Sequence, residues 1–511
     1  MPAVLAGALA ALFVGSLTNT VVGIALPTIA GELGGQDQVP WVASAALLTM
    51  TVATPLWGKA ADRRGPRDLL LAALGVFVAG SLLAGCAPAM GVLLAGRAVQ
   101  GAGAGGILAL TNALVAGLVP ARERGRYTGW FGVSFGTASV AGPLVGGLLV
   151  GAPGPGWRWC FLGVIPVALG AAALVRLAPH RVPAAPRAGV DLLGGALLTA
   201  GASGTVVLLS AGGRTWPWAS WPTAALAAAV LGAAAAGVRQ ERRAPDPILP
   251  PRLFCRRGLT VACATGFLVG AVMFGGVIYL PQYLQVVRGH DATEAGLLML
   301  PQVGTMIVAS TLAGRLITRT GRWKVFPVTG CALVTAGAVL LSPLTPDTPA
   351  WWLAGAMAVL GVGTGLTQQV LVLVAQNAVG PGDVGTAGAA ATFSRTLGGA
   401  VGVAAFGAVL SARMRSGTPP GQEARDLLGT PESVAALPAH LAESVRASYT
   451  DGLSSVFLLT VPLAAAALVA VLLVRETPLE GRDQDTGPGP YRMMCPVRPR
   501  SRCAVCGQSP K

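Results

Sequence analysis

Apolar stretches of about twenty residues recur along nearly the whole chain, and a helix of that length crosses the hydrocarbon core of a bilayer. Only 11% of the residues are charged, whereas a typical soluble domain carries about 25%. Inside lipid the backbone must satisfy its own hydrogen bonds, and segments this long and uniformly apolar do so as helices, not as barrel strands. The composition therefore predicts an all-α polytopic membrane protein.

We expect fourteen apolar spans. They cover residues 4–27, 40–58, 68–86, 90–118, 128–150, 158–177, 191–211, 222–238, 259–284, 295–316, 325–343, 351–375, 385–411 and 452–474. The first span has no basic flank, and no convincing cleavage site follows it. It is therefore expected to remain in the protein and not to be removed as a signal peptide.

Basic residues are distributed unevenly between the connections. The loops alternate between a set that is poor in basic residues and a set that is rich in them. The poor set consists of short loops that hold only Arg158, Arg214 and Arg288. The rich set holds Lys59, Arg63, Arg64, Arg67, Arg122, Arg124, Arg126, Arg176, Arg181, Arg187, Arg239, Arg242, Arg243, Arg252, Arg256, Arg257, Arg315, Arg319, Arg322 and Lys324. The positive-inside rule places this richer set, and both termini, in the cytoplasm. We expect a multi-pass protein of the inner (plasma) membrane. Charge that alternates in this way does not favour nucleic-acid binding.

The pattern divides the chain into five parts. They are an N-terminal six-helix bundle (1–180), two extra transmembrane helices (181–240), a cytoplasmic linker (241–258), a C-terminal six-helix bundle (259–476) with an external loop (412–451), and a disordered tail (477–511). The segment Gly314–Arg322 weakly repeats the segment that begins at Gly58, with Thr318 in the place of Asp62. Repeated halves are typical of transporters, whose substrate path lies between them.

The segment Gly58–Arg67 joins two apolar runs and is predicted to form a tight, charged loop at the cytoplasmic surface. Gly58 and Gly65 permit close approach of two helices. Asp62 is suited to cap a helix start and to pair with an arginine. A tight loop without a functional role remains the alternative interpretation.

Polar residues inside the spans are the next candidates. Arg97, with Gln100 one turn later, lies in span 90–118, and a guanidinium at membrane depth is costly unless it is paired or hydrated. A cavity-facing Arg97 is therefore expected, with snorkelling from a helix end as the alternative. Arg395 would reach a cavity or lipid phosphates. Asp191 is expected to cap the helix that follows it, with a coupling role as the alternative. Glu32 is expected in an external loop.

Several of these segments resemble motifs of the major facilitator superfamily. Gly58–Arg67 resembles its signature loop between helices 2 and 3, and the run from Arg97 to Gly103 resembles its fourth-helix motif, whose arginine is implicated in proton relay. The run Gly142-Pro143-Leu-Val-Gly146-Gly147 is similar to the helix-5 motif of its antiporters, with Ala138 where the pattern has glycine.

The first span, around Leu17–Pro27, resembles the first-helix motif of the fourteen-helix drug/proton antiporter branch. That motif has an acid where Thr18 stands and an asparagine where Gly23 stands, so ordinary proton coupling is in doubt. The resemblance continues from about residue 12 to residue 475. It rests on the further stretches 157–161, 191–194, 279–285, 295–301 and 394–400.

The resemblance implies a major facilitator fold of two six-helix bundles plus two central helices. It also implies a secondary active transporter that exports amphipathic small organic molecules, as in drug or antibiotic efflux, by proton antiport. Asp62 with Arg63 and Arg67 would then latch the cytoplasmic side, and Arg97 would be the central cation. Thr18 and Asn19 would bond the substrate or Arg97. Candidate lining residues are Tyr279, Gln282 and Gln285.

The expected partners are the small-molecule substrate, protons and the lipid bilayer, and we expect a monomer without a cofactor. A metabolite uniporter or importer of the same superfamily is the alternative, because Thr18 replaces the acid. A polytopic membrane enzyme is a remote alternative, since the sequence shows no clustered acids, histidines or nucleophile. Cys495, Cys503 and Cys506 offer too few ligands for a four-ligand zinc site, so no metal is expected.

Overall fold

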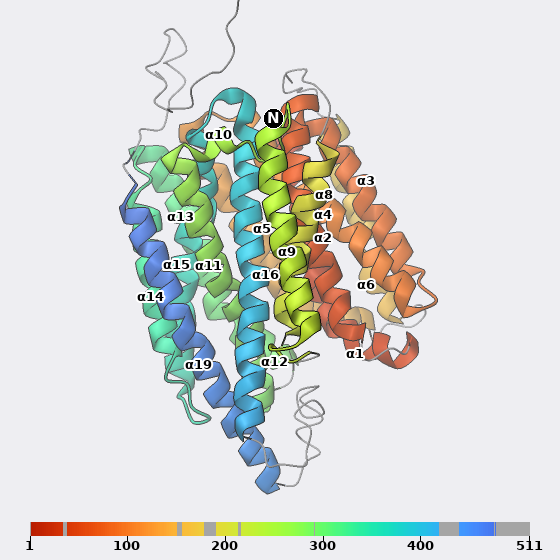
Figure 1. Cartoon of the computed structure of the whole chain (residues 1–511), viewed down its shortest axis with the longest axis vertical. Helices are drawn as coiled ribbons and strands as arrows, with labels where there is room; N and C mark the ends of the chain where they lie inside the picture. Colours follow the sequence, from red (N-terminus) through yellow and green to blue (C-terminus); the bar gives the residue numbers. More distant parts are fainter. Residues whose placement is uncertain are drawn as a thin grey trace, which may run out of the picture.

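A computed structural model describes residues 2–33, 38–150, 156–177, 191–212, 216–290, 292–417, 439–474 and 476. Within these ranges the regular structure is helical, apart from one isolated bridge between Gly212 and Trp216. Long helices run side by side along one direction (Figure 1). The all-helical fold expected from the apolar runs is therefore confirmed.

The first half of the chain forms one bundle, drawn in red and orange in Figure 1. Its elements are α1 (Pro2–Leu33), α2 (Val39–Arg64), α3 (Pro66–Gly85), α4 (Met90–Leu118), α5 (Ala121–Val150), a 3-10 turn (Gly156–Arg158), α6 (Trp159–Leu162) and α7 (Val164–Leu177). Here α1 packs on α5 and α7, while α4 packs on α2 and α3.

The last part of the chain forms a second bundle. Its elements are α11 (Arg257–Gln282), a π-helical turn (Tyr283–Val287), α12 (Ala292–Leu298), α13 (Leu300–Thr320), α14 (Val325–Leu341), α15 (Ala350–Asn377), a 3-10 turn (Pro381–Asp383), α16 (Val384–Gly417) and α19 (Ala439–Leu472). Here α16 packs on α11, and α15 packs on α13 and α14. The two bundles meet where α5 packs on α13 and where α2 packs on α16.

Between the bundles the chain adds a helical pair, α8 (Leu192–Ala211) and α9 (Trp221–Arg243), followed by the short helix α10 (Pro251–Phe254). The two helices pack on each other, and α8 also contacts α2 and α16. In Figure 1, α9 runs in front of the line where the bundles meet. The extra pair therefore sits beside the junction of the two halves.

Eleven helices of the described residues are long and apolar enough to cross a membrane, and residues 193–209 and 325–341 form shorter apolar helices. The protein is thus a multi-pass membrane protein. The helix α5 falls outside both groups, so the count of fourteen spans stays a prediction.

The halves repeat each other in the way their helices touch. A methyl group on Gly101 of α4 would lie 2.2 Å from the carbonyl oxygen of Ala46 on α2, and one on Gly361 of α15 would lie 2.2 Å from that of Gln302 on α13. Each glycine permits the same close helix crossing in its own half. The internal repeat expected from the Gly314–Arg322 segment is therefore present in the packing.

The structure corrects one local prediction. Residues 58–64 are the last two turns of α2 and not a loop, and the connection to α3 is Gly65 alone, with φ of 84°. The positive φ turns the chain without further residues, and only glycine adopts it without strain. The mirror position Gly321, after α13, has φ of 70°.

Helices also enter both ends of the predicted external loop 412–451, because α16 continues to Gly417 and α19 begins at Ala439. The five-part division of the chain otherwise stays a prediction. The expected disordered tail, 477–511, lies outside the described residues.

Candidate functional site

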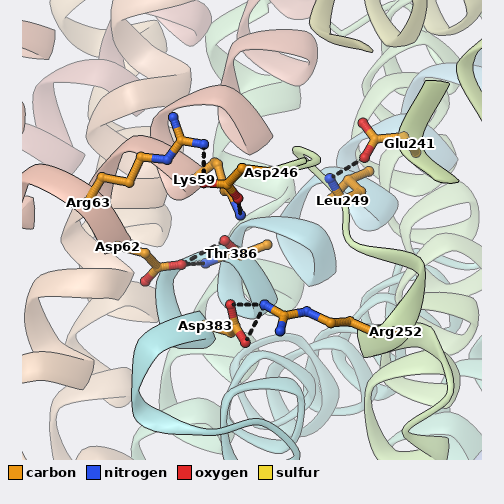
Figure 2. A network of polar contacts seen from close by, with 9 residues as sticks. All are labelled: Lys59, Asp62, Arg63, Glu241, Asp246, Leu249, Arg252, Asp383 and Thr386. Atoms are coloured by element: carbon orange, nitrogen blue, oxygen red, sulfur yellow. Dashed lines mark hydrogen bonds and ion pairs between the residues drawn. The ribbon is translucent and has the colours of Figure 1, made fainter. Parts of the chain in front are cut away.

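The carboxylate of Asp62 reaches across the junction between the two halves. Its Oδ1 accepts a hydrogen bond from the backbone N–H of Gly385 at 2.8 Å. Its Oδ2 accepts from the backbone N–H of Thr386 at 2.8 Å and from the Thr386 hydroxyl at 2.6 Å. Gly385 and Thr386 are in the first turn of α16, where backbone donors lack helical partners and the helix dipole is positive. Asp62 of α2 therefore caps a helix of the other bundle, as Figure 2 shows.

Lys59 and Arg63, one turn apart on α2, bind a different carboxylate. The Nζ of Lys59 lies 2.6 Å from Asp246 Oδ1, and an Arg63 nitrogen lies 2.5 Å from Asp246 Oδ2. Burial alone would raise the pKa of Asp246, but the two cations outweigh it and lower that pKa below its ordinary value. Asp246 lies in the segment between α9 and α10, so these ion pairs fasten that segment to α2.

Two further contacts complete this polar group, all of which is drawn in Figure 2. Glu241 of α9 accepts a hydrogen bond from the backbone N–H of Leu249 at 3.0 Å. Arg252 of α10 lies 3.2 Å from Asp383, just before α16. We call the residues Lys59, Asp62, Arg63, Glu241, Asp246, Arg252, Asp383 and Thr386 the polar lock, and the end of the molecule that carries it the basic end.

The predicted latch of Asp62 with Arg63 and Arg67 was wrong in its pairing. Arg67 donates to the carbonyl oxygens of Val175 at 3.1 Å and Arg176 at 2.6 Å, at the end of α7. A cation suits the carbonyl groups that end a helix. Gly58 lies where α2 meets α16: a methyl group there would be 2.1 Å from the Cβ of Ala389.

Arg97 is 2% exposed and lies in a cluster of neutral hydrogen-bond acceptors. Its Nε donates to the carbonyl of Val42 at 3.0 Å, and its two terminal nitrogens donate to Gln100 at 2.6 Å and to Asn19 at 3.2 Å. Gln100 in turn donates to Ser81 at 2.8 Å. The predicted link between Asn19 and Arg97 is therefore present, and Arg97 does not snorkel.

Thr18 does not take part in this cluster through its hydroxyl, which donates to the carbonyl of Val14 on its own helix at 2.9 Å. A narrow pocket nevertheless adjoins both Thr18 and Arg97. It is lined by Gly15, Thr18, Asn19, Ala46, Met50, Phe77, Arg97, Gln100, Gly101 and Ala104.

The predicted helix-5 motif lies along α5, where Gly142 packs against α1. A methyl group on Gly142 would lie 2.1 Å from Thr20 Oγ1, and that hydroxyl donates to the carbonyl of Ala138 at 3.1 Å. Gly146 is buried, whereas Gly147 is exposed with open space around it. Pro143 lies in the same helix. The motif thus joins α1 to α5.

In the second half, Arg395 on α16 is 8% exposed, and its Nε has no hydrogen-bond partner among the described residues. Tyr279 donates to the carbonyl of Val403 at 2.7 Å, and Gln282 accepts from Tyr449 at 2.8 Å. Gln285 is half-buried. The lining role predicted for Tyr279, Gln282 and Gln285 stays a prediction.

Two acids lie at helix ends. Asp191 caps α8, as predicted, by accepting from the backbone N–H of Gly194 at 2.9 Å. Glu32 lies in the last turn of α1 and not in a loop; it accepts from Arg158 at 2.5 Å and from Trp157 at 2.7 Å. The hydrogen bonds from Arg158 and Trp157 lower the pKa of Glu32.

Sequence reasoning missed four residues of the lock, and Asp246, which binds two cations, is the most central of them. The other three are Glu241, Asp383 and Thr386. The available signal for Asp246 was an acid between two prolines in a linker, among the connections richest in basic residues. That pattern does not indicate which cation the acid meets.

Two helical bundles with matching internal packing, joined at one end by a polar lock and holding a buried arginine cluster, define a membrane transporter. A model of the Major Facilitator Superfamily matches residues 8–403. An uncharacterised MFS-type transporter of Mycobacterium tuberculosis is 37% identical over 468 residues, which are 90% of this chain and 67% of that protein. The multidrug transporter protein MdtP of Bacillus subtilis is 31% identical over 407 residues, 80% of this chain and 75% of that protein.

Among solved structures, the human organic anion transporter MFSD10 aligns with a TM-score of 0.60. The alignment covers 91% of this chain and 99% of that one, at 16% identity, and the likeness therefore concerns the fold. The chain belongs to the Major Facilitator Superfamily.

Proposed function

We propose that the protein is a secondary active transporter that exports amphipathic small organic molecules across the plasma membrane by alternating access and proton antiport. In this proposal the basic end and both termini face the cytoplasm, in agreement with the positive-inside rule. Relatives at about 30% identity that are named a multidrug transporter and efflux pumps support export as the activity.

One observation carries the proposal: Asp62 of the first half caps α16 of the second half. Alternating access requires the halves to separate at one end while they close at the other. The cap, with its charge on the positive end of a helix, stabilises closure at the basic end and breaks when that end opens. In this proposal the cap is the gate through which substrate enters from the cytoplasm.

Proton coupling is the part of the proposal with an alternative. The hydroxyl of Thr18 bonds its own helix and carries no charge, which favours a uniporter or importer of a metabolite. The carboxylate tied most directly to closure is Asp62, whose protonation would remove the negative charge from the cap. Antiport would therefore run through the lock and not through α1.

The test is efflux of fluorescent dyes, both cationic and anionic, from cells expressing the full chain. We expect at least one dye to be exported, and export to stop when a protonophore collapses the proton gradient. The Asp62→Asn variant should export poorly at equal expression. Export that survives the protonophore would reject antiport, and import of a metabolite without dye export would support the alternative.

A further inference from the structure

Acidic residues are scarce in the interiors of the described helices. The helices α4, α11, α13, α14 and α15 contain no Asp or Glu. The acids of the other helices in the first half and the central pair lie within three residues of a helix end; they are Glu32, Asp62, Asp68, Glu123 and Glu241. In α19, Asp451 lines a pocket with Ser342, the residue after α14, and so lies at the end opposite the lock.

Arg97 is the first of the two buried arginines among the described residues. It lies seven residues into α4, roughly 10 Å along the helix at 1.5 Å per residue. All its hydrogen-bond partners are neutral oxygens, from Val42, Gln100 and Asn19. The guanidinium is therefore solvated by the protein, but no carboxylate in the described residues balances its charge.

Arg395 is the second of these arginines, and fewer of its side-chain donors have hydrogen-bond partners. Its backbone packs directly on α11: a methyl group on Gly270 would lie 2.2 Å from the Arg395 carbonyl oxygen. Nearer the start of α16, Gly388 lies against the side chain of Gln376, which belongs to the neighbouring helix α15. Gln369 comes two turns before Gln376 on α15, and Arg395 comes two turns after Gly388 on α16.

Three buried polar atoms, on α16, α15 and α11, lack partners in the described structure. The Nε of Arg395 and the Oε1 of Gln369 are both buried without a hydrogen bond in the described structure, and so is the Oγ1 of Thr265 on α11. A buried donor or acceptor without a partner is costly. The buried Nε of Arg395 is therefore available to a ligand group that accepts hydrogen bonds and carries negative charge.

The two arginines belong to opposite bundles, whose helices α4 and α16 contact each other. The two buried guanidinium groups therefore belong to facing bundles, in a medium of low dielectric constant where charges interact strongly. An anion is attracted at both positions, and a cation meets repulsion without a carboxylate to offset it.

We infer that the substrate is an amphipathic organic anion, whose carboxylate, sulfonate or phosphate group is bound by Arg97 and Arg395. This inference rests on the proposed transport function and specifies its substrate class. Arg395, with its unpartnered Nε, is the specificity-determining residue, and Arg97 exchanges a neutral partner for the anion.

The test compares two ligands of the same shape and opposite charge on the purified full-length protein. Naphthalene-2-carboxylate should raise the unfolding temperature in a saturable way, and 2-naphthylmethylammonium should not. The variant Arg395→Gln should weaken carboxylate binding by at least about tenfold. Arg395→Lys, which keeps the charge and loses the planar donor fork, should bind with intermediate affinity.

A matched control is Arg239→Gln, which removes an exposed arginine from α9 and should leave carboxylate binding unchanged. Equal or stronger stabilisation by the ammonium compound, no stabilisation by the carboxylate, or an Arg395→Gln variant that binds as the wild type does would each overturn the inference. These outcomes are independent of the dye-export assay. Export of cationic dyes only would overturn the substrate class and leave transport standing, whereas absence of all export would reject the transport proposal.

Discussion

The two halves meet at two similar corners of the basic end, and the aspartate at the first corner corresponds to a threonine at the second. At the first corner, α2 meets the start of α16, where Asp62 lies against Gly385. At the second, α13 meets the start of α5, where a methyl group on Gly125 would lie 3.2 Å from Thr318 Oγ1. The backbone approach is the same, but Thr318 has no charge to place on a helix N-terminus.

The difference extends to the surroundings of each corner. The first corner also carries the ion pairs of Lys59 and Arg63 with Asp246, from the segment after the extra helices. The duplicated geometry therefore differs in charge: the first corner carries the carboxylate of Asp62, and the second carries the neutral hydroxyl of Thr318. We expect changes at the first corner to affect transport strongly and matched changes at the second to affect it weakly.

The largest effect is expected from Asp62→Asn, which removes the charge and one strong acceptor from the cap. Loss of such a cap costs about 1–3 kcal/mol of closure, and dye export should fall by about tenfold or more. The mirror variant Thr318→Val should change export by less than about twofold. Equal losses in the two variants would contradict the proposed asymmetry.

Gly58→Ala should have the second largest effect on export. The added methyl group would lie 2.1 Å from the Cβ of Ala389, so α2 and α16 must move apart at a cost of about 1–3 kcal/mol. A lower unfolding temperature and slower export are expected. Gly91→Ala is the matched control, because its methyl group would meet nothing within 4 Å; a comparable loss there would point to a general effect of helix substitution.

Asp246→Asn should have a smaller effect that depends on pH. Lys59 and Arg63 lower the pKa of Asp246 against the effect of burial. The stability that the ion pairs contribute is therefore present above the ordinary aspartate pKa and is lost as the pH falls through the lowered one. Thermal unfolding of wild type and variant should differ by about 1–2 kcal/mol at neutral pH and converge in acid. A constant gap down to strongly acidic pH would argue against the ion pairs as its source.

Thr318→Asp should have the smallest effect and the opposite sign. An acid at the second corner would face the start of α5, and a charge at a helix N-terminus contributes about 0.3–1 kcal/mol. We expect slightly higher thermal stability and slower export, because both corners then resist opening. Faster export in this variant would show that the second corner does not take part in closure.

Sequence reasoning could predict the elements and the repeat, because both follow from local patterns. Apolar runs define the spans, and Thr318 was recognised as the counterpart of Asp62 from spacing alone. The neighbourhood of Arg97 was partly accessible, since Gln100 lies one helical turn away and Asn19 was one of the two partners expected on the first span. The other, Thr18, bonds its own helix instead.

The partners of the lock could not be predicted in the same way. Asp62 bonds residues more than 300 positions later, and Asp246 meets α2 only because the extra helices return the chain there. Such pairings depend on how the two bundles dock, which no local pattern specifies. The helical state of residues 58–64 was missed because charged residues near a glycine also indicate a loop; here the single positive φ of Gly65 makes the whole turn.

The central claim is that Asp62 holds the basic end closed, and a distance measurement across that end tests it most directly. Spin labels would be placed at exposed Arg64, at the end of α2, and at exposed Pro381, before α16, after replacement of the native cysteines. The account predicts a mainly short distance in the wild type, a long-distance population that grows in Asp62→Asn, and no such growth in Thr318→Val. An unchanged distribution in Asp62→Asn would contradict it.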